Sequence, residues 1–452
     1  MKQNKIVLIP SLSENSFLRY FNFIALYFAQ GIPEGMLAFG IPAWMAMNGK
    51  SPAEIANFTI VVVLPWSFKI IVAPLIDRYT YLSMGRKRPW VIIGQLGLVL
   101  SFAYMAYIPD PLNNLNQFML AGFIVSFFGA FQDVATDGMA VDIIPAEQQA
   151  KTNNLMWGSK ICGISISLAL GSWILNKYGY TTAILTLSAI ISCIMFVPIL
   201  LRERNGEKIL PWTQGKAAPE AEMFQLENWR EIFKALYSVF TLRNSLLIAG
   251  VLFVSQGAFK FLGTLLPVFT VKVLEWTNVE YAQYYASAKL IGGISGMLLG
   301  GILIDKFGKK RMLFIYFFCL ILLVSFLSLN KAYWANKSII YSFMILYNTF
   351  YTFSSIGLFA IAMQCCWRKV SASQFTLYMT IANLGQMSFA ALINPISSTF
   401  NWQISLLFFA FFLVLAGFIL YFLDIEKQIE LVAELELKDI EIKSNVLSIS
   451  NH

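Results

Sequence analysis

The sequence predicts an all-α membrane protein with twelve transmembrane helices in two related, pseudo-symmetric bundles of six. The chain is 58% hydrophobic and 13% charged, and its mean hydropathy is +0.64. Such a composition is far too apolar for a soluble domain. Twelve apolar runs are each long enough to cross a hydrocarbon core of about 30 Å as a helix. Several landmarks recur in both halves at similar spacing, which indicates an internal duplication.

The twelve predicted spans fill most of the chain. They lie at residues 18–46, 54–76, 89–108, 117–143, 152–176, 180–201, 244–271, 280–304, 312–330, 337–364, 373–396 and 401–423. The resulting domains are an N-terminal six-helix bundle at 1–201, a cytoplasmic linker at 202–243, a C-terminal six-helix bundle at 244–424 and a cytoplasmic tail at 425–452. The linker segment NWREIFKALYSVF has the pattern of an amphipathic helix. We expect no cleaved leader before the first span.

Basic residues are biased to one side of the predicted membrane. With the N-terminus inside, the cytoplasmic flanks carry two clusters, GRKR at 85–88 and GKKR at 308–311, whereas the opposite side has only scattered lysines. The positive-inside rule therefore predicts that both termini are cytoplasmic, in the inner membrane. The net charge of +8 reflects this orientation, and we expect a monomer in the lipid bilayer with no nucleic-acid partner.

The fourth span carries three acidic residues in FQDVATDGMAVDIIP. An ionised aspartate at the bilayer centre costs about 2.5–3.5 kcal/mol, so these residues need partners or water. Asp133 and Asp137 are four residues apart and share a helix face, whereas Asp142 lies on the side opposite Asp133, near the helix end at Pro145. Two duplicated bundles of six helices with both termini inside are the architecture of secondary transporters that alternate around a central site. We therefore predict that Asp133 and Asp137 couple transport to protons, and that Asp142 belongs to a gate.

Lysines accompany these aspartates at the same depth. Counted from the helix ends at about 1.5 Å per residue, Lys69 and Lys160 lie level with Asp133. Two interpretations remain open: a compensated Lys-Asp-Lys cluster that holds three helices together, or lysines that bind an anionic substrate. The predicted substrate contacts are Lys69, Lys160, Gln132, Gln374, Gln30 and Lys260.

The first helix of each half carries a shared signature near its middle. Gln30-Gly31 and Gln256-Gly257 occupy matching places, and four residues after the glutamine stand Glu34 in one half and Lys260 in the other. Pseudo-symmetry places these two facing each other, so that protonation of Glu34 or substrate binding would release the pair. The alternative is that Lys260 extends toward an interface and Glu34 only caps a helix break.

The loops after the second and eighth spans resemble motif A of the major facilitator superfamily, most clearly in GGILIDKFGKKR. In that superfamily the loop locks the bundles in one orientation. The resemblance implies a gating set of Asp77, Arg78, Arg86, Arg88, Asp142, Asp305, Lys306 and Arg311.

The segments FKIIVAPLIDRY, FQDVATDGMAVDIIPAEQQA and SASQFTLYMTIANLGQ resemble the AmpG-like branch of this superfamily, the muropeptide permeases, which are related to acetyl-CoA transporters. The resemblance implies a proton symporter that takes up anionic, amphiphilic cell-wall sugar-peptides of the GlcNAc-anhydroMurNAc type for recycling. The seventh helix departs from the branch, because it reads SQGAFKF where an acidic residue and a lysine are usual.

Other functions are open to discrimination by experiment. A carrier of acyl-CoA, a nucleotide or another organic anion would share the fold, and a non-transporting membrane sensor is a further alternative. An enzyme is not expected, because the only histidine is His452 and no clustered acid-base or metal-ligand pattern is visible. We therefore predict no catalytic residue, no metal and no cofactor.

Overall fold

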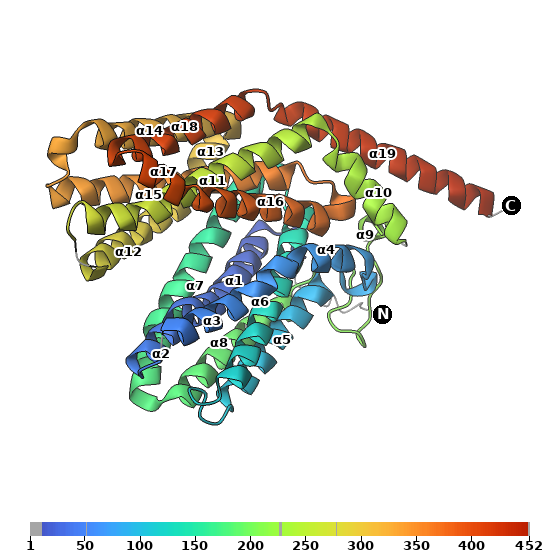
Figure 1. Ribbon diagram of the computed structural model, residues 1–452. Coiled ribbons are helices and arrows are strands. Elements are labelled where there is room, and N and C mark those ends of the chain that lie inside the picture. Colours follow the sequence, from blue (N-terminus) through green and yellow to red (C-terminus); the bar gives the residue numbers. More distant parts are fainter. Residues whose placement is uncertain (1–10, 51, 226–227, 277, 451–452) are drawn as a thin grey trace. The chain divides into compact units, whose positions relative to one another are not determined.

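The helices of the structure, a computed structural model, coincide with the predicted spans. It describes residues 11–50, 52–225, 228–276 and 278–450, so the chain ends that we predict to be cytoplasmic, including His452, lie outside. Single or consecutive helices cover all twelve predicted spans (Figure 1). Among the described residues, ten such segments are long and apolar enough to cross a membrane. The other two predicted spans are helical but contain more polar side chains, such as Arg19 and Gln374.

The described chain divides into two compact units. The first comprises the chain up to Ile144, together with Ser159–Ala235 and Arg368–Thr376; the second comprises Pro145–Gly158, Leu236–Trp367 and the chain from Leu377. Each unit thus contains a short segment from the other half of the sequence. The two exchanged segments correspond to each other. Pro145–Gly158 contains the start of the fifth span, and Arg368–Thr376 contains the start of the eleventh, which is the fifth span of the second half.

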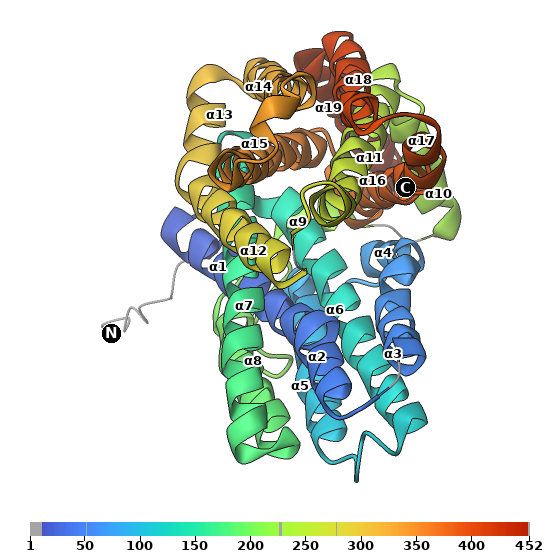
Figure 2. The same cartoon turned by 60° about the vertical axis from the view of Figure 1, so that its left-hand side comes forward.

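The first unit is a bundle in which α5 packs against α6 and α8, while α1 and α3 pack against α6 (Figure 2). Its helices are α1 Ser16–Gly35, α2 Ile41–Met47, α3 Pro52–Val63, α4 Lys69–Arg78, α5 Arg88–Ala106, α6 Leu115–Ile143, α7 Gln149–Tyr178 from Ser159 onward, α8 Tyr180–Leu200 and the short α9 Pro219–Met223.

Two of its spans are interrupted. A π-helical turn, Met36–Gly40, joins α1 to α2, and a 3-10 turn, Leu64–Phe68, joins α3 to α4. Pro65 lies in the second turn, where its missing N–H and its ring disfavour a regular α-helix. The interruption puts Trp66 in the turn and Lys69 at the first position of α4.

The second unit repeats this arrangement. In it α12 packs against α15, α14 against α15 and α18, and α11 against α18. Its helices are α11 Arg243–Lys272, α12 Asn278–Ser295, α13 Gly301–Phe307, α14 Lys309–Leu329, α15 Lys337–Gln364, α16 Ser371–Ala391 from Leu377 onward, α17 Ile393–Thr399, α18 Trp402–Tyr421 and α19 Ile425–Ser450, with a π-helical turn at Gly296–Gly300.

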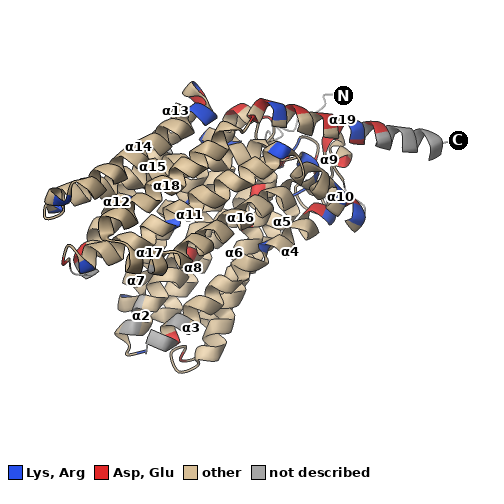
Figure 3. Ribbon diagram, turned by 45° about the horizontal axis from the view of Figure 1, so that its top comes forward, with Lys and Arg blue, Asp and Glu red and all other residues tan. Residues whose placement is uncertain are grey.

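Charged side chains are sparse along α14, α15 and α18 and gather on α10 (Trp229–Phe240) and α19 (Figure 3). The amphipathic helix predicted in the linker is α10, which buries Ile232 and Val239 and exposes Phe233 and Tyr237. The predicted tail forms α19, and Gln428 on it donates a hydrogen bond to Ser245 at 2.9 Å.

Glycines let two helix pairs cross with their backbones in contact. A Cβ atom placed on Gly31 of α1 would lie 2.3 Å from the Lys160 carbonyl oxygen of α7, and one on Gly385 of α16 would lie 2.1 Å from the Phe253 carbonyl oxygen of α11. The first and fifth spans of one unit and the first and fifth of the other therefore meet in the same way. This geometry supports the duplication inferred from Gln30-Gly31 and Gln256-Gly257.

Replacing either crossing glycine by alanine should destabilise its unit. We expect Gly31→Ala and Gly385→Ala each to cost about 1–3 kcal/mol, because the added methyl group overlaps a backbone oxygen that cannot rotate away. Thermal unfolding of the purified protein in detergent measures the effect. Gly250→Ala on α11 is the matched control, since its Cβ would lie 3.6 Å from the nearest atom, in the Ile419 side chain. Equal unfolding midpoints for all three variants would contradict the backbone-contact interpretation.

Candidate functional site

The second span supplies a buried cation to the aspartates of α6. The Lys69 ammonium forms an ion pair with the Asp133 carboxylate, and the two side chains are only 10% and 7% exposed. Because Lys69 opens α4 directly after the 3-10 turn, the break around Pro65 fixes where this cation lies. The sequence places Lys69 and Asp133 at the same depth, and in the structure their side chains are in direct contact.

A second ion pair, which is partly buried, lies beside the first. The Lys160 ammonium of α7 lies 3.0 Å from the Glu34 carboxylate of α1. The Trp66 ring connects the two pairs, since Lys69 lies 4.3 Å and Lys160 5.2 Å from its centroid. Glu34 thus has a partner within its own unit, and the pairing of Glu34 with Lys260 stays a prediction.

Asp137 completes the polar cluster of the first unit. Its carboxylate accepts a hydrogen bond from the Tyr27 hydroxyl of α1, and both side chains are buried. Tyr27 was not among the predicted site residues. The signal that points to it is helical spacing, because Tyr27, Gln30 and Glu34 lie on one face of α1.

The predicted glutamines are buried in the same unit. The Gln132 amide donates to Thr136 Oγ1 at 3.1 Å and to the Leu26 carbonyl at 3.4 Å. The Gln30 amide is 1% exposed, and its polar atoms have no hydrogen-bond partner among the described residues. Gln374 is also fully buried, in the segment of α16 that belongs to the first unit.

The second unit contains a separate cavity of about 210 Å³. It lies among α11, α12, α15 and α16, and the predicted Lys260 lines it together with Lys289. Aromatic and amide side chains form much of the described wall, namely Tyr285, Tyr347, Tyr351, Gln256 and Gln386. Lys289 was not among the predicted site residues.

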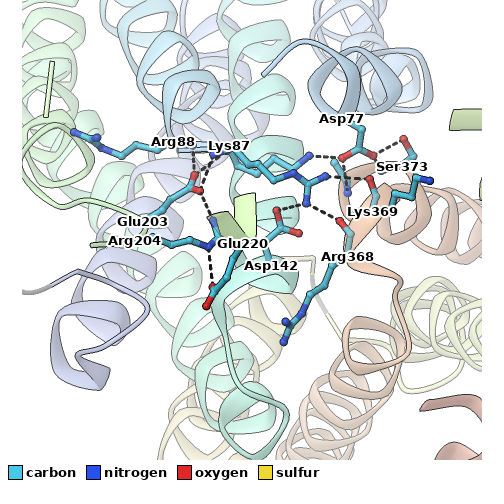
Figure 4. Close-up of polar contacts among 12 residues, drawn as sticks. Asp77, Lys87, Arg88, Asp142, Glu203, Arg204, Glu220, Arg368, Lys369 and Ser373 are labelled. Carbon is cyan, nitrogen blue, oxygen red and sulfur yellow. Dashed lines mark hydrogen bonds and ion pairs between the residues drawn. The ribbon is translucent and has the colours of Figure 1, made fainter. Parts of the chain in front are cut away.

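Two of the predicted gating residues, Asp77 and Arg86, contact the start of α16 and the 3-10 turn Arg368–Val370 just before it (Figure 4). Asp77 is fully buried, forms an ion pair with Lys87, and accepts hydrogen bonds from the Ser373 amide at 2.7 Å and the Ser373 hydroxyl at 2.6 Å. The carboxylate thus lies at the positive end of the α16 dipole. Lys87, in the middle of GRKR, was missing from the predicted set.

Arg86 joins the same segment to the end of α6. Its guanidinium lies 3.0 Å from the Asp142 carboxylate and donates to the carbonyl oxygens of Arg368 at 2.7 Å and Lys369 at 3.0 Å. A contact of Asp142 with Arg86 or Arg88 was expected, and Arg86 makes it. The carboxylate and the chain segment 368–369 are therefore held by one cation.

The other two arginines of this region point elsewhere. Arg88 donates to main-chain carbonyl oxygens, among them Pro198 and Ile199 at 2.6 Å, so it anchors the end of α8. Arg78 lies 5.1 Å from the Trp229 ring centroid and so contacts α10. Asp142 is therefore not the partner of Arg78 or Arg88.

A linker carboxylate that looked solvated in the sequence is buried at the start of α5. Glu203 accepts hydrogen bonds from the backbone amides of Arg86 at 2.8 Å and Lys87 at 2.7 Å, and also from that of Arg88. The Arg204 guanidinium is 3.2 Å away (Figure 4). Burial, with the Glu203 charge beside it, raises the pKa of Glu207 to about 8. The RERNGEK run is therefore part of the folded unit.

The corresponding basic loop of the second unit is held by neutral partners. Lys309 donates to the Gln364 side chain and, at 3.4 Å, to the Ala146 carbonyl oxygen. Asp305 and Arg311 line a cavity of about 740 Å³ at this end of the unit, and Lys306 lies 5.4 Å from the Phe307 ring centroid.

Known proteins share both the sequence pattern and the fold. The sequence model of the Major Facilitator Superfamily matches residues 23–390. The anhydromuropeptide permease of Escherichia coli K12 is 24% identical over 395 residues, which cover 85% of this chain and 75% of that protein. A putative transporter, AmpG 3 of Rickettsia prowazekii, is 23% identical over 62% of this chain and 65% of its own length.

Solved structures agree on the fold. A variant of the Escherichia coli fucose:proton symporter FucP superimposes with a TM-score of 0.66 at 13% identity, covering 90% of this chain and 98% of that one. The human organic anion transporter MFSD10 (TETRAN) gives a TM-score of 0.63 at 12% identity, covering 91% and 100%. The chain belongs to the Major Facilitator Superfamily and is a multi-pass membrane transporter of the secondary type rather than an enzyme.

Proposed function

We propose that this transporter is a proton symporter that takes up an anionic sugar-peptide of the anhydromuropeptide class across the inner membrane, with both termini in the cytoplasm. The names of its relatives support the solute class, since an anhydromuropeptide permease aligns with 85% of the chain. The bias of the GRKR and GKKR loops to one side of the spans supports the orientation.

The two ion pairs around Trp66 carry the coupling proposal. While Asp133 is ionised it neutralises Lys69, and Glu34 does the same for Lys160. A proton on Asp133 removes its charge and leaves Lys69 without its ion-pair partner, which is unfavourable by about 3–5 kcal/mol. A proton on Glu34 likewise removes a negative charge from beside Lys160. An anionic solute relieves that cost. Proton and solute therefore favour each other's binding, and Lys69 and Lys160 become substrate contacts only after protonation.

Asp137 and the buried glutamines extend this site. Asp137 lies one helical turn from Asp133 and is held by Tyr27, so it is placed to pass a proton along the same face of α6. Gln30, Gln132 and Gln374 are buried amides, each able to donate and accept hydrogen bonds to sugar hydroxyl or peptide groups.

For the gate, we propose Asp77, Lys87, Arg86 and Asp142. Asp77, paired with Lys87, binds the first turn of α16, and Arg86, paired with Asp142, binds the Arg368 and Lys369 carbonyl oxygens just before it. The continuation of α16 from Leu377 belongs to the second unit. Releasing these contacts would free that turn. The role of Asp305, Lys306 and Arg311 in a second gate rests on the repeat of the loop sequence.

Uptake into proteoliposomes tests the proposed function. With a radiolabelled GlcNAc-anhydroMurNAc-tripeptide, we expect accumulation against its gradient when the outside is more acidic than the inside, and loss of that accumulation when a protonophore is added. Acyl-CoA and a nucleotide serve as competitors. Accumulation of one of these in place of the sugar-peptide would identify an organic-anion carrier, and tight binding without flux would identify a sensor.

A further inference from the structure

The cavity of the second unit has an uncompensated positive charge. Lys260 of α11 and Lys289 of α12 line it with exposed side chains. None of the described residues that line the cavity is acidic. Within the described ranges, neither lysine has an ion pair or a hydrogen bond to its side chain. Two cations thus face a cavity whose described lining residues include no carboxylate.

The first unit differs in this respect. Its two lysines, Lys69 and Lys160, are both occupied by carboxylates, and Asp137 adds a third acid to the cluster. The ionised carboxylates of this cluster compete with an incoming anion for the two lysines until they are protonated. The anion meets no such competition at Lys260 and Lys289, so Coulomb attraction favours the second unit as the place where the solute's charge first binds.

The walls of this cavity suit carboxylate groups. Gln256 donates one amide hydrogen to Ser355 at 3.3 Å, which fixes the side chain and leaves its second N–H for a solute. The Tyr347 hydroxyl donates its only hydrogen to the Phe259 carbonyl oxygen at 3.1 Å, so it shapes the wall without donating to the solute. Gln386 and Thr264 add amide and hydroxyl groups to the wall. Ammonium, amide and hydroxyl donors together are the groups that bind a carboxylate in a partly dehydrated site.

The volume limits what can enter. The cavity measures about 210 Å³, whereas sites that enclose a whole drug-sized ligand measure roughly 300–1,000 Å³. It therefore has room for one end of a sugar-peptide and not for the entire molecule. Gly263 leaves the cavity open on α11, because a Cβ placed there would meet nothing within 4 Å.

We propose that Lys260 and Lys289 form a carboxylate subsite that binds the peptide end of the solute, so that the second unit selects for charge and the first unit couples to protons. This assignment rests on the proposed function for the identity of its solute. Before protonation Lys69 and Lys160 are ion-paired and do not bind the solute's charge, and Lys260 and Lys289 take that role.

The test compares a sugar-peptide with its analogue in which every carboxylate is amidated. For Lys260→Gln and Lys289→Gln we expect the KM for the carboxylated solute to rise about tenfold or more, the size expected for loss of a charge-assisted contact. The KM for the amidated analogue should stay unchanged, which also shows that the variants fold. Lys331→Gln, a lysine of the same unit outside the cavity lining, is the control.

A steric variant addresses the same cavity without changing charge. Gly263→Leu should block uptake of both solutes, whereas Gly263→Ala should leave it near the parent level, because only the larger side chain fills the space. Unchanged KM values for the carboxylated solute in the Lys260→Gln/Lys289→Gln double variant would overturn the subsite.

A binding measurement separates this inference from the transport proposal. Thermal stabilisation of the detergent-purified protein by the carboxylated sugar-peptide should disappear in the double lysine variant and persist in Lys331→Gln. If the parent protein binds in this lysine-dependent way but moves no solute, the transport proposal fails and the subsite stands. If the parent transports the solute and the double variant is stabilised equally, the subsite fails and transport stands.

Discussion

Asp133→Asn is expected to reduce proton-driven uptake by at least about a hundredfold. An asparagine has the shape of aspartate but neither carries a proton nor neutralises Lys69, whose side chain is only 10% exposed. The variant thus resembles the protonated state permanently and cannot complete a cycle that requires the proton to leave. Initial rates in proteoliposomes under an imposed pH gradient measure this loss.

Solute exchange provides the internal comparison for Asp133→Asn. Exchange of labelled for unlabelled solute at equal pH needs no net proton movement, so we expect it to be retained while gradient-driven accumulation is lost. Asp110→Asn is the matched control, because Asp110 lies in an exposed turn and its carboxylate bonds to Asn113. Accumulation by Asp133→Asn at the parent rate would show that the proton is carried elsewhere, with Asp137→Asn as the next variant to examine.

Asp142→Leu is expected to be the most destabilising single change in the Arg86 cluster. The Arg86 and Asp142 side chains are 0% and 1% exposed, so removing the carboxylate leaves a buried cation. We expect a cost of about 3–5 kcal/mol. The double variant Arg86→Met/Asp142→Leu should recover part of this loss, since no lone charge remains. Recovery stays incomplete because Arg86 also binds the Arg368 and Lys369 carbonyl oxygens.

The second unit offers a matched position for this comparison. Gln364 receives a hydrogen bond from Lys309 near the end of α15, as Asp142 does from Arg86 near the end of α6. Because Gln364 is neutral, Gln364→Leu should lower the unfolding midpoint far less than Asp142→Leu. Detergent-solubilised protein followed by tryptophan fluorescence on heating gives both midpoints. Equal losses at the two positions would mean that the charge of Asp142 is not what stabilises the first unit.

Features that depend only on distance along a helix could be predicted from the sequence. The spans follow from apolar length, and the Lys69–Asp133 contact follows from counting depth along two helices. The close packing of α12 against α15 is also foreseeable, because Gly292 and Gly296 lie on one face of the eighth span and approach Asn348 and Thr352.

Partners that depend on how two helices cross were not predictable. The Lys160–Glu34 contact, which the crossing of α1 and α7 at Gly31 brings about, was not predicted, whereas the pairing of Glu34 with Lys260 stays a prediction. Only its helical spacing from Gln30 and Glu34 distinguishes Tyr27, since the chain contains 19 tyrosines and most membrane helices carry several aromatics. Glu203 was hidden in a charged run that, by composition, resembles a solvated linker.

The exchanged segment at the start of α16 sets an order for biosynthesis. Asp77 is completely buried, yet its partner Ser373 is synthesised 296 residues later, and Arg368, which Arg86 binds, follows that arginine by 282 residues. When the sixth span leaves the ribosome, the first half therefore still lacks the backbone that satisfies these charges. Maturation of the N-terminal half has to await synthesis of the start of the eleventh span. We therefore expect that a gene divided in the linker would yield an N-terminal product that needs its C-terminal counterpart to finish folding.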